Sequence, residues 1–170
     1  MTELIRLNEK NPMQKRVVVF AITLPFVVVS LVATSLIGQE KRIKKSDLPA
    51  AVQKAADEQS KGATIKGYNK EIENGKVEYE VELVVNSHSR NVSMDPQGNV
   101  LEVEEEVSLD SLPKAVREGL KQNAGKGIIR KIESIAKHGT LVAYEAHIMT
   151  AGKRSEIQVG PDGKTLEHEE

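Results

Sequence analysis

The chain contains no cysteine and no tryptophan among its 170 residues, and aromatic residues make up only 3% of it. The absence of cysteine excludes a disulfide scaffold, a thiol nucleophile, Cys-ligated zinc and lipid attachment through a cysteine. It leaves the redox compartment open, because a cysteine-free chain is tolerated in an oxidising or a reducing environment. The scarcity of aromatic side chains favours a thin, aliphatic core made of two layers.

An excess of one charge is also missing, since 24 Lys and Arg residues are balanced by 25 Asp and Glu residues, for a formal net charge of −1. A general nucleic-acid binder needs a broad basic field, so this class of protein is excluded. Charged residues make up 29% of the chain and apolar residues 39%, which is typical of a folded protein. The length allows one ordinary domain or two very small ones.

The sequence lacks the motifs by which common catalytic sites are recognised. It has no Gly-x-Ser-x-Gly elbow, no His-Glu-x-x-His helix and no phosphate loop that ends in Gly-Lys-Ser or Gly-Lys-Thr. Gly125-Lys126-Gly127 lacks the spacing of a phosphate loop, and we interpret it as the exit from a helix into a strand. We therefore predict that the protein is not an enzyme and has neither a cofactor nor a metal site.

A long uncharged segment, VVVFAITLPFVVVSLVATSLI, occupies residues 17–37. At about 1.5 Å per residue, a helix of this length spans roughly 30 Å, the thickness of the hydrocarbon core of a bilayer. An uncleaved transmembrane anchor is favoured, because the apolar core of a signal peptide is usually only about 7–15 residues long. The alternative is a cleaved signal peptide, for which Ala33-Thr34-Ser35 offers a candidate cleavage site. Basic residues flank the segment equally on both sides, so the positive-inside rule does not decide its orientation.

The rest of the sequence repeats itself. Leu48-Pro49-Ala50-Ala51-Val52 matches Leu112-Pro113-Lys114-Ala115-Val116 at an offset of 64, and Tyr79-Glu80 matches Tyr144-Glu145 at an offset of 65. Such ordered matches predict two copies of one unit. The predicted organisation is an N-terminal tail with anchor or signal (1–38), a basic linker (39–46), a first repeat (47–107) and a second repeat (108–170).

Each copy is predicted to contain one helix followed by four antiparallel strands. Pro49 and Pro113 suit the first turn of a helix, where the missing N–H costs nothing. Residues 77–83 alternate apolar and acidic side chains, as a half-buried strand does. The predicted fold class is α+β: a tandem repeat of a helix plus a four-stranded antiparallel sheet, behind one N-terminal transmembrane or signal helix. A copy of about 60 residues buries little surface alone, so we expect the two copies to share a core or a continuous sheet.

This order of features resembles the PepSY-like family, which is related to beta-lactamase-inhibitor-like domains. The resemblance covers residues 46–170 and implies an α+β fold exported from the cytoplasm, with a non-catalytic binding or inhibitory role. The residues that carry it are the helix starts, the central strands Val77-x-Tyr79-Glu80-Val81-x-Leu83 and Val142-x-Tyr144-x-Ala146-x-Ile148, and the endings Pro96-x-Gly98-x-x-Leu101-Glu102 and Pro161-x-Gly163-x-x-Leu166-Glu167.

Acidic residues are the most distinctive polar feature of the first copy. They alternate along two predicted strands, which places the carboxylates of each strand on one face about 6–7 Å apart. If the two strands are neighbours, six carboxylates form an acidic patch that could attract a basic peptide or hold Ca²⁺. A solvated face with lysine neighbours is the alternative interpretation. The candidate partner-binding residues are Glu78, Glu80, Glu82, Glu102, Glu104 and Glu106.

His147 lies beside Glu145 on the outward face of its predicted strand. Such a pair can bind a cation weakly, but a solvated surface is the favoured interpretation.

The function predicted from the sequence is that of a membrane-tethered, extracytoplasmic protein that binds or inhibits another protein or peptide in the cell envelope. The membrane is reached through residues 17–37. The alternative location is secreted or periplasmic, after signal cleavage. The alternative function is a cation-binding envelope protein that uses the acidic strand faces.

Overall fold

A computed structural model describes residues 40–73 and 75–166 of the chain. The predicted membrane segment at 17–37 lies outside the described residues. Within the described ranges, no helix is long and apolar enough to cross a bilayer.

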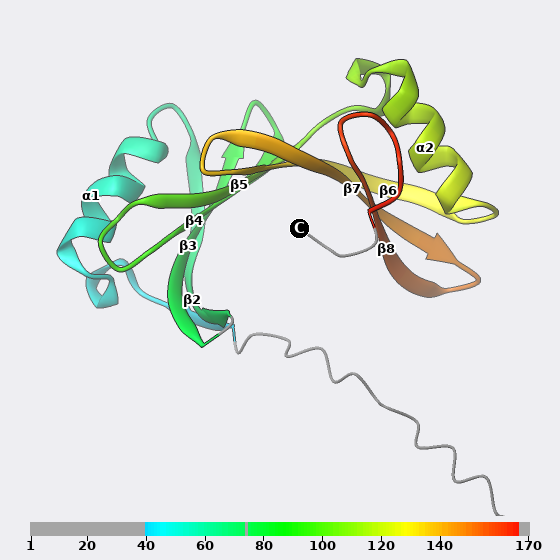
Figure 1. The fold of residues 1–170 in the computed structure, drawn as a ribbon. Coiled ribbons are helices and arrows are strands. Elements are labelled where there is room, and N and C mark those ends of the chain that lie inside the picture. The colour runs from blue at the N-terminus through cyan, green and yellow to red at the C-terminus, as the bar shows by residue number, and fades with distance from the viewer. Residues whose placement is uncertain (1–39, 74, 167–170) are drawn as a thin grey trace, which may run out of the picture. The chain divides into compact units, whose positions relative to one another are not determined.

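The described chain forms a single antiparallel sheet of eight strands in the order β1 to β8, with two α-helices (Figure 1). Two short 3₁₀ helices, Lys45–Asp47 and Leu109–Ser111, precede the α-helices. The remaining elements are β1 (Lys41–Ile43), α1 (Ala50–Gln59), β2 (Thr64–Glu73), β3 (Lys76–Val85), β4 (His88–Met94), β5 (Val100–Glu106), α2 (Lys114–Ala124), β6 (Ile128–Lys137), β7 (Thr140–Thr150) and β8 (Lys153–Val159).

The predicted fold class, a tandem repeat of a helix plus a four-stranded sheet, is wrong. β5 pairs with β6 over five consecutive positions, from Glu102 opposite Lys137 to Glu106 opposite Glu133, so all strands belong to one sheet. The pairing satisfies backbone groups that two separate sheets would leave at exposed edges. In the second half, three named strands follow α2 where four were predicted, and the described residues after Gly163 add one bridge, between Val159 and Thr165. Lys41–Ile43, in the predicted linker, adds a short strand beside β2.

Both helices pack on the same face of the sheet. Val81, Val92 and Val103 lie opposite one another across β3, β4 and β5, and side chains opposite one another in a sheet point to the same face. Continuing across β6, Ala136 lies opposite Val103 and shares its face with Ile132. Figure 1 shows α1 beside the early strands and α2 beside β6, β7 and β8.

Two groups of buried apolar side chains hold the helices to the sheet. Val52 and Ala56 of α1 pack with Val81, Leu83 and neighbouring residues. A separate group under α2 contains Leu112, Val116, Leu120, Ile132, Tyr144, Ala146 and Val159. Because the helices are only 10 and 11 residues long, their stability depends on this burial.

The opposite face of the sheet, here called the polar face, carries the alternate residues of each strand. It is covered by neither α1 nor α2. Its residues include Asn69 and Glu71 of β2, Glu78, Glu80 and Glu82 of β3, Ser89, Asn91 and Ser93 of β4, Glu102, Glu104 and Glu106 of β5, Lys131, Glu133, Ile135 and Lys137 of β6, Ala143, Glu145 and His147 of β7, and Glu156 and Gln158 of β8.

Candidate functional site

The six candidate glutamates all lie on the polar face, but their two strands are not neighbours. β4 lies between β3 and β5, so that Asn91 separates Glu82 from Glu104 and Ser93 separates Glu80 from Glu102. The structure therefore divides the six carboxylates between two strands, β3 and β5, with uncharged polar side chains of β4 between them.

Glu80 and Glu82 are joined by the amide of Asn69, which is almost fully buried. Its Nδ2 donates to Glu80 Oε1 at 2.9 Å and to Glu82 Oε1 at 3.0 Å. Burial raises the pKa of Glu80, and the neighbouring charge of Glu82 adds to this effect. Burial also acts on Glu82, but hydrogen bonds from Arg42, 2.7 Å away, and from Asn69 outweigh it and lower the pKa of Glu82.

Glu102 and Glu106 lie near the two ends of β5, and each has a polar partner on a neighbouring strand. Glu106 Oε2 accepts hydrogen bonds from the backbone N–H and the hydroxyl of Ser89, and the backbone bond is the main reason that the pKa of Glu106 is lowered. Glu102 Oε2 lies 3.5 Å from Nζ of Lys137 on β6. Both carboxylates are therefore stabilised as anions.

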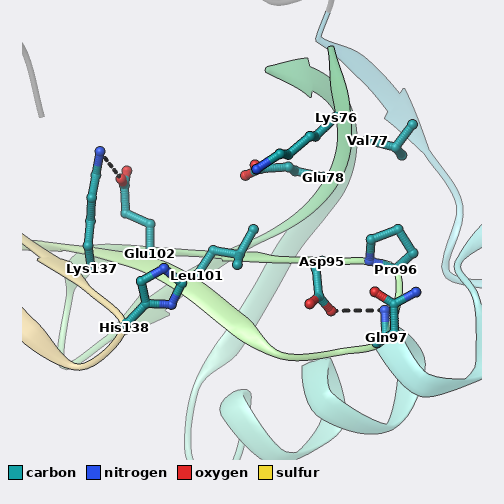
Figure 2. Close-up of a pocket in the computed structure, with 10 residues that line it drawn as sticks. All are labelled: Lys76, Val77, Glu78, Asp95, Pro96, Gln97, Leu101, Glu102, Lys137 and His138. Atoms are coloured by element: carbon teal, nitrogen blue, oxygen red, sulfur yellow. Dashed lines mark hydrogen bonds and ion pairs between the residues drawn. The ribbon is translucent and has the colours of Figure 1, made fainter. Parts of the chain in front are cut away.

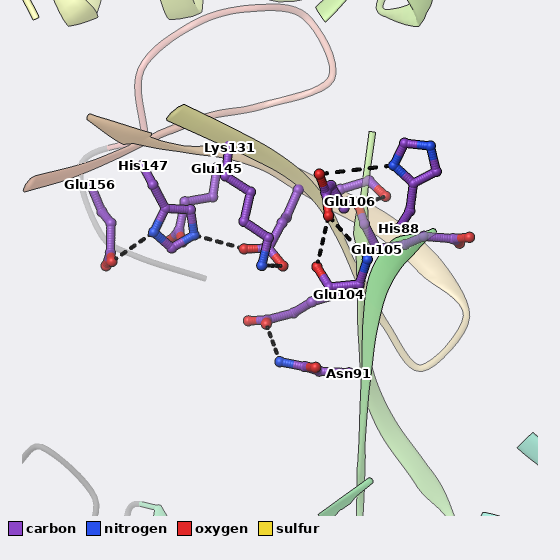
Figure 3. Close-up of polar contacts among 12 residues, drawn as sticks. His88, Asn91, Glu104, Glu105, Glu106, Lys131, Glu145, His147 and Glu156 are labelled. Atoms are coloured by element: carbon purple, nitrogen blue, oxygen red, sulfur yellow. Dashed lines mark hydrogen bonds and ion pairs between the residues drawn. The ribbon is translucent and has the colours of Figure 1, made fainter. Parts of the chain in front are cut away.

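Glu104, between them, is in a different environment. Burial, together with the charges of Glu133 and Glu102, raises its pKa to about 8. The side-chain contact that the structure gives it is Asn91 Nδ2 at 3.5 Å, a long hydrogen bond (Figure 3). Glu104 is thus an acidic group in the middle of the polar face whose negative charge is poorly stabilised by its surroundings.

A second polar group, which includes residues that the sequence did not single out, occupies β6, β7 and β8. His147 Nε2 lies 2.7 Å from Glu133 Oε2 and 3.3 Å from Glu145 Oε1, and its Nδ1 lies 3.0 Å from Glu156 Oε1 (Figure 3). Glu133 is buried and also lies 2.6 Å from Lys131 Nζ. His147 and Glu145 were predicted from the sequence to be a surface pair, but local alternation does not reveal the register that adds Glu133 from β6.

A pocket of about 740 Å³ lies where three strand connections meet, and its lining carries both charges (Figure 2). Asp95 is held by the turn that it starts, because its Oδ1 accepts from the backbone N–H of Gln97 at 2.9 Å. The remaining lining residues are Lys76, Val77, Glu78, Pro96, Leu101, Glu102, Lys137 and His138.

No protein-family model matches this chain, and no curated protein matches it. Solved structures that share its fold include three from Bacteroides species. A BLIP-like protein from Bacteroides fragilis superposes with a TM-score of 0.51 and 21% identity over 68% of this chain and 81% of its own. A DUF2874 family protein from Bacteroides ovatus superposes with a TM-score of 0.56 and 16% identity, over 71% of this chain and 85% of its own. A protein from Bacteroides eggerthii that is inferred to be periplasmic superposes with a TM-score of 0.58 and 17% identity, over 70% of this chain and 86% of its own.

These identities are too low to establish more than the fold. The beta-lactamase-inhibitor-like part of the predicted resemblance is supported at that level by the BLIP-like structure. None of the three similar structures is described as PepSY-like. The described part of the chain therefore has a fold similar to that of BLIP-like and DUF2874 family proteins.

Proposed function

We propose that this chain is a non-catalytic protein that binds another protein or a peptide through the polar face, outside the cytoplasm. In this proposal residues 17–37 tether the chain to the membrane. The BLIP-like neighbour supports a binding role, and the neighbour inferred to be periplasmic supports the location.

The observation that carries the proposal is the environment of Glu104. Its pKa of about 8 results from burial and from the surrounding carboxylates. A lysine or arginine of a partner placed beside this carboxylate would supply the missing opposite charge and favour the ionised form. The proposed partner therefore presents a basic segment to the strands β3 to β6.

Site-specific photocrosslinking in intact cells tests this surface. A photoreactive residue at Ser93, between Glu80 and Glu102, is expected to give one discrete crosslinked species. The same residue at Gln122, exposed on α2 on the other side of the sheet, is the matched control. Equal crosslinking at both positions, or none at Ser93, would contradict the proposal.

The proposed location is tested separately by protease treatment of intact cells, followed by mass determination of the protected fragment. An anchored chain leaves a fragment that contains residues 17–37, whereas a cleaved signal yields a mature chain that begins after it. Complete protection of residues 40–166 in cells with a permeable outer layer would show that the folded part is cytoplasmic.

Cation binding by the acidic strands is a second candidate function. Ligand oxygens of Glu40, Glu71 and Glu80 lie within 4.8 Å of one another. Within the described part of the chain, the buried Asn69 Oδ1 of the same face has no hydrogen-bond partner. Oxygen donors of this kind suit Ca²⁺. Calorimetry with Ca²⁺ and Mg²⁺ tests this candidate, which is rejected if millimolar ion gives neither binding heat nor a shift in melting temperature.

A further inference from the structure

We propose that Glu133, Glu145 and His147 form a binding site for a divalent transition metal of the Zn²⁺ class. Their ligand atoms come from the adjacent strands β6 and β7 and lie within 4.8 Å of one another. The site adjoins the proposed basic-partner surface, because the charge of Glu133 also acts on Glu104. It departs from the sequence-based prediction that the chain has no metal site.

Each of the three ligands is already oriented by a neighbour through the atom that would not bind the metal. His147 Nδ1 lies 3.0 Å from Glu156 Oε1, and Glu145 Oε2 accepts from Gln158 Nε2 at 2.8 Å. Glu133 Oε1 lies 2.6 Å from Lys131 Nζ. Ligand side chains in metal sites are commonly fixed in this way, with a carboxylate on the far nitrogen of a histidine.

The charge of the group matches a dication. With a neutral imidazole, Glu133, Glu145, Glu156 and Lys131 together carry a formal charge of −2. Glu133 is 4% exposed, so that water does little to offset this charge. A bound dication would neutralise the formal charge of −2, so that no further cationic side chain is needed beside the group.

The donor set selects the class of metal. One imidazole nitrogen with two carboxylate oxygens suits Zn²⁺ and related transition metals, whereas Ca²⁺ and Mg²⁺ prefer sites made of oxygen alone. The His147 Nε2 to Glu133 Oε2 distance of 2.7 Å is that of a hydrogen bond. Binding would displace the proton from this contact and separate the two atoms to roughly 3.3 Å, as tetrahedral bonds of about 2.0 Å require.

The geometry leaves a place for a fourth ligand. The His147 side chain is 34% exposed, and an opening of about 540 Å³ adjoins it. Its charged lining residues, besides His147, are Arg130, Lys131, Arg154 and Glu156. Solvent therefore reaches His147 from the side of this opening, which Glu133 and Glu145 do not line. Three protein ligands with an open position are the arrangement of a Zn²⁺ ion that also binds water.

Zinc titration of the full chain in mild detergent, without a histidine tag, tests the site. Calorimetry is expected to show one Zn²⁺ per chain, with proton release that scales with the buffer ionisation heat. His147→Gln is expected to abolish binding, and Glu156→Gln to weaken it about tenfold. Excess MgCl₂ should not compete.

Two control variants test two of the other three histidines, His88 and His168. His88→Gln should bind zinc as the parent chain does, because His88 faces the single carboxylate of Glu106 at 3.8 Å. His168→Gln should also retain binding, which excludes chelation by Glu167-His168-Glu169-Glu170. The proposal is overturned if the parent chain binds no zinc, or if a folded His147→Gln variant binds it equally. Should His147→Gln not fold, X-ray absorption of the zinc-loaded parent chain decides, since a spectrum without one imidazole ligand overturns it.

Discussion

Gly119 of α2 lies directly against the carbonyl oxygen of Gly163, so that a Cβ at position 119 would overlap that oxygen. In the same region, a Cβ on Gly163 would overlap the carbonyl oxygen of Ala115. The loop after β8 is thus seated on the backbone of α2, and glycine at both positions allows this approach.

Gly119→Ala is therefore expected to destabilise the protein by about 2 kcal/mol, although alanine is the better helix former by about 1 kcal/mol. The clash is with backbone, which cannot rotate away. Thermal or urea unfolding measures the loss. Gln122→Ala, at an exposed position of the same helix, is the control and should leave stability nearly unchanged or improve it. A stabilised Gly119→Ala variant would show that the loop does not lie on the helix.

Glu104 should make stability fall as pH rises. Its pKa is about 8 in the folded chain and near 4.5 when unfolded, so between these values the folded state binds the extra proton. Unfolding is then increasingly favoured from about pH 4.5 to about pH 8 by on the order of a few kcal/mol. Glu104→Gln removes this loss, and we expect the variant to exceed the parent chain in melting temperature at pH 8.5 and to match it near pH 4.

The matched control is Glu105→Gln, which changes the neighbouring carboxyl on the other face of β5. It should leave the slope of stability against pH between 4.5 and 8 unaltered. Parallel pH profiles for the parent chain and Glu104→Gln would mean that Glu104 ionises normally.

Ile135 is 2% exposed although it lies on the polar face, away from both helices. Ile135→Ala is expected to cost about 2–4 kcal/mol, as truncation of a buried isoleucine does. Ile128→Ala, at a side chain that is 56% exposed, should cost far less. Because β5 and β6 belong to one sheet, circular dichroism and a probe placed in β3 should report a single unfolding transition for Ile135→Ala. Two separate transitions would argue against a cooperative sheet.

Arg42 on β1 lies 2.7 Å from Glu82 and is one of the causes that lower the pKa of that carboxyl. Arg42→Gln should raise the pKa of Glu82 in an NMR titration and cost less than about 1 kcal/mol, because the pair is partly exposed. The stability that the pair contributes is present above the unfolded pKa of Glu82 and is lost as pH falls through its lowered folded value. Lys41→Gln, whose side chain alternates to the other face, should leave the titration of Glu82 unchanged.

Local patterns predicted much of the secondary structure but not its assembly. The alternation around Tyr79 and Tyr144 predicted strands with one buried side. Tyr144 is buried in the group under α2, and Tyr79 is partly buried against the group under α1. The pairing of β5 with β6 depends on two strands joined through a helix, and no local periodicity encodes that register.

The candidate site was predicted unevenly for the same reason. Alternation placed Glu102, Glu104 and Glu106 on one face, because side-chain direction in a strand is a local property. It did not indicate that β4 separates them from Glu78, Glu80 and Glu82, nor that Glu133 meets His147. Contacts between strands depend on register, and a single sequence fixes register only where a short turn connects the strands.

β5 and β6 are hydrogen-bonded to each other, and the chain segment that connects them contains α2. Opening the backbone near Ser108 would leave two fragments with complementary, unsatisfied strand edges. Each fragment would also retain one helix and one apolar group of its own. The protein is therefore suited to reconstitution from two separately expressed pieces, in the manner of a split reporter.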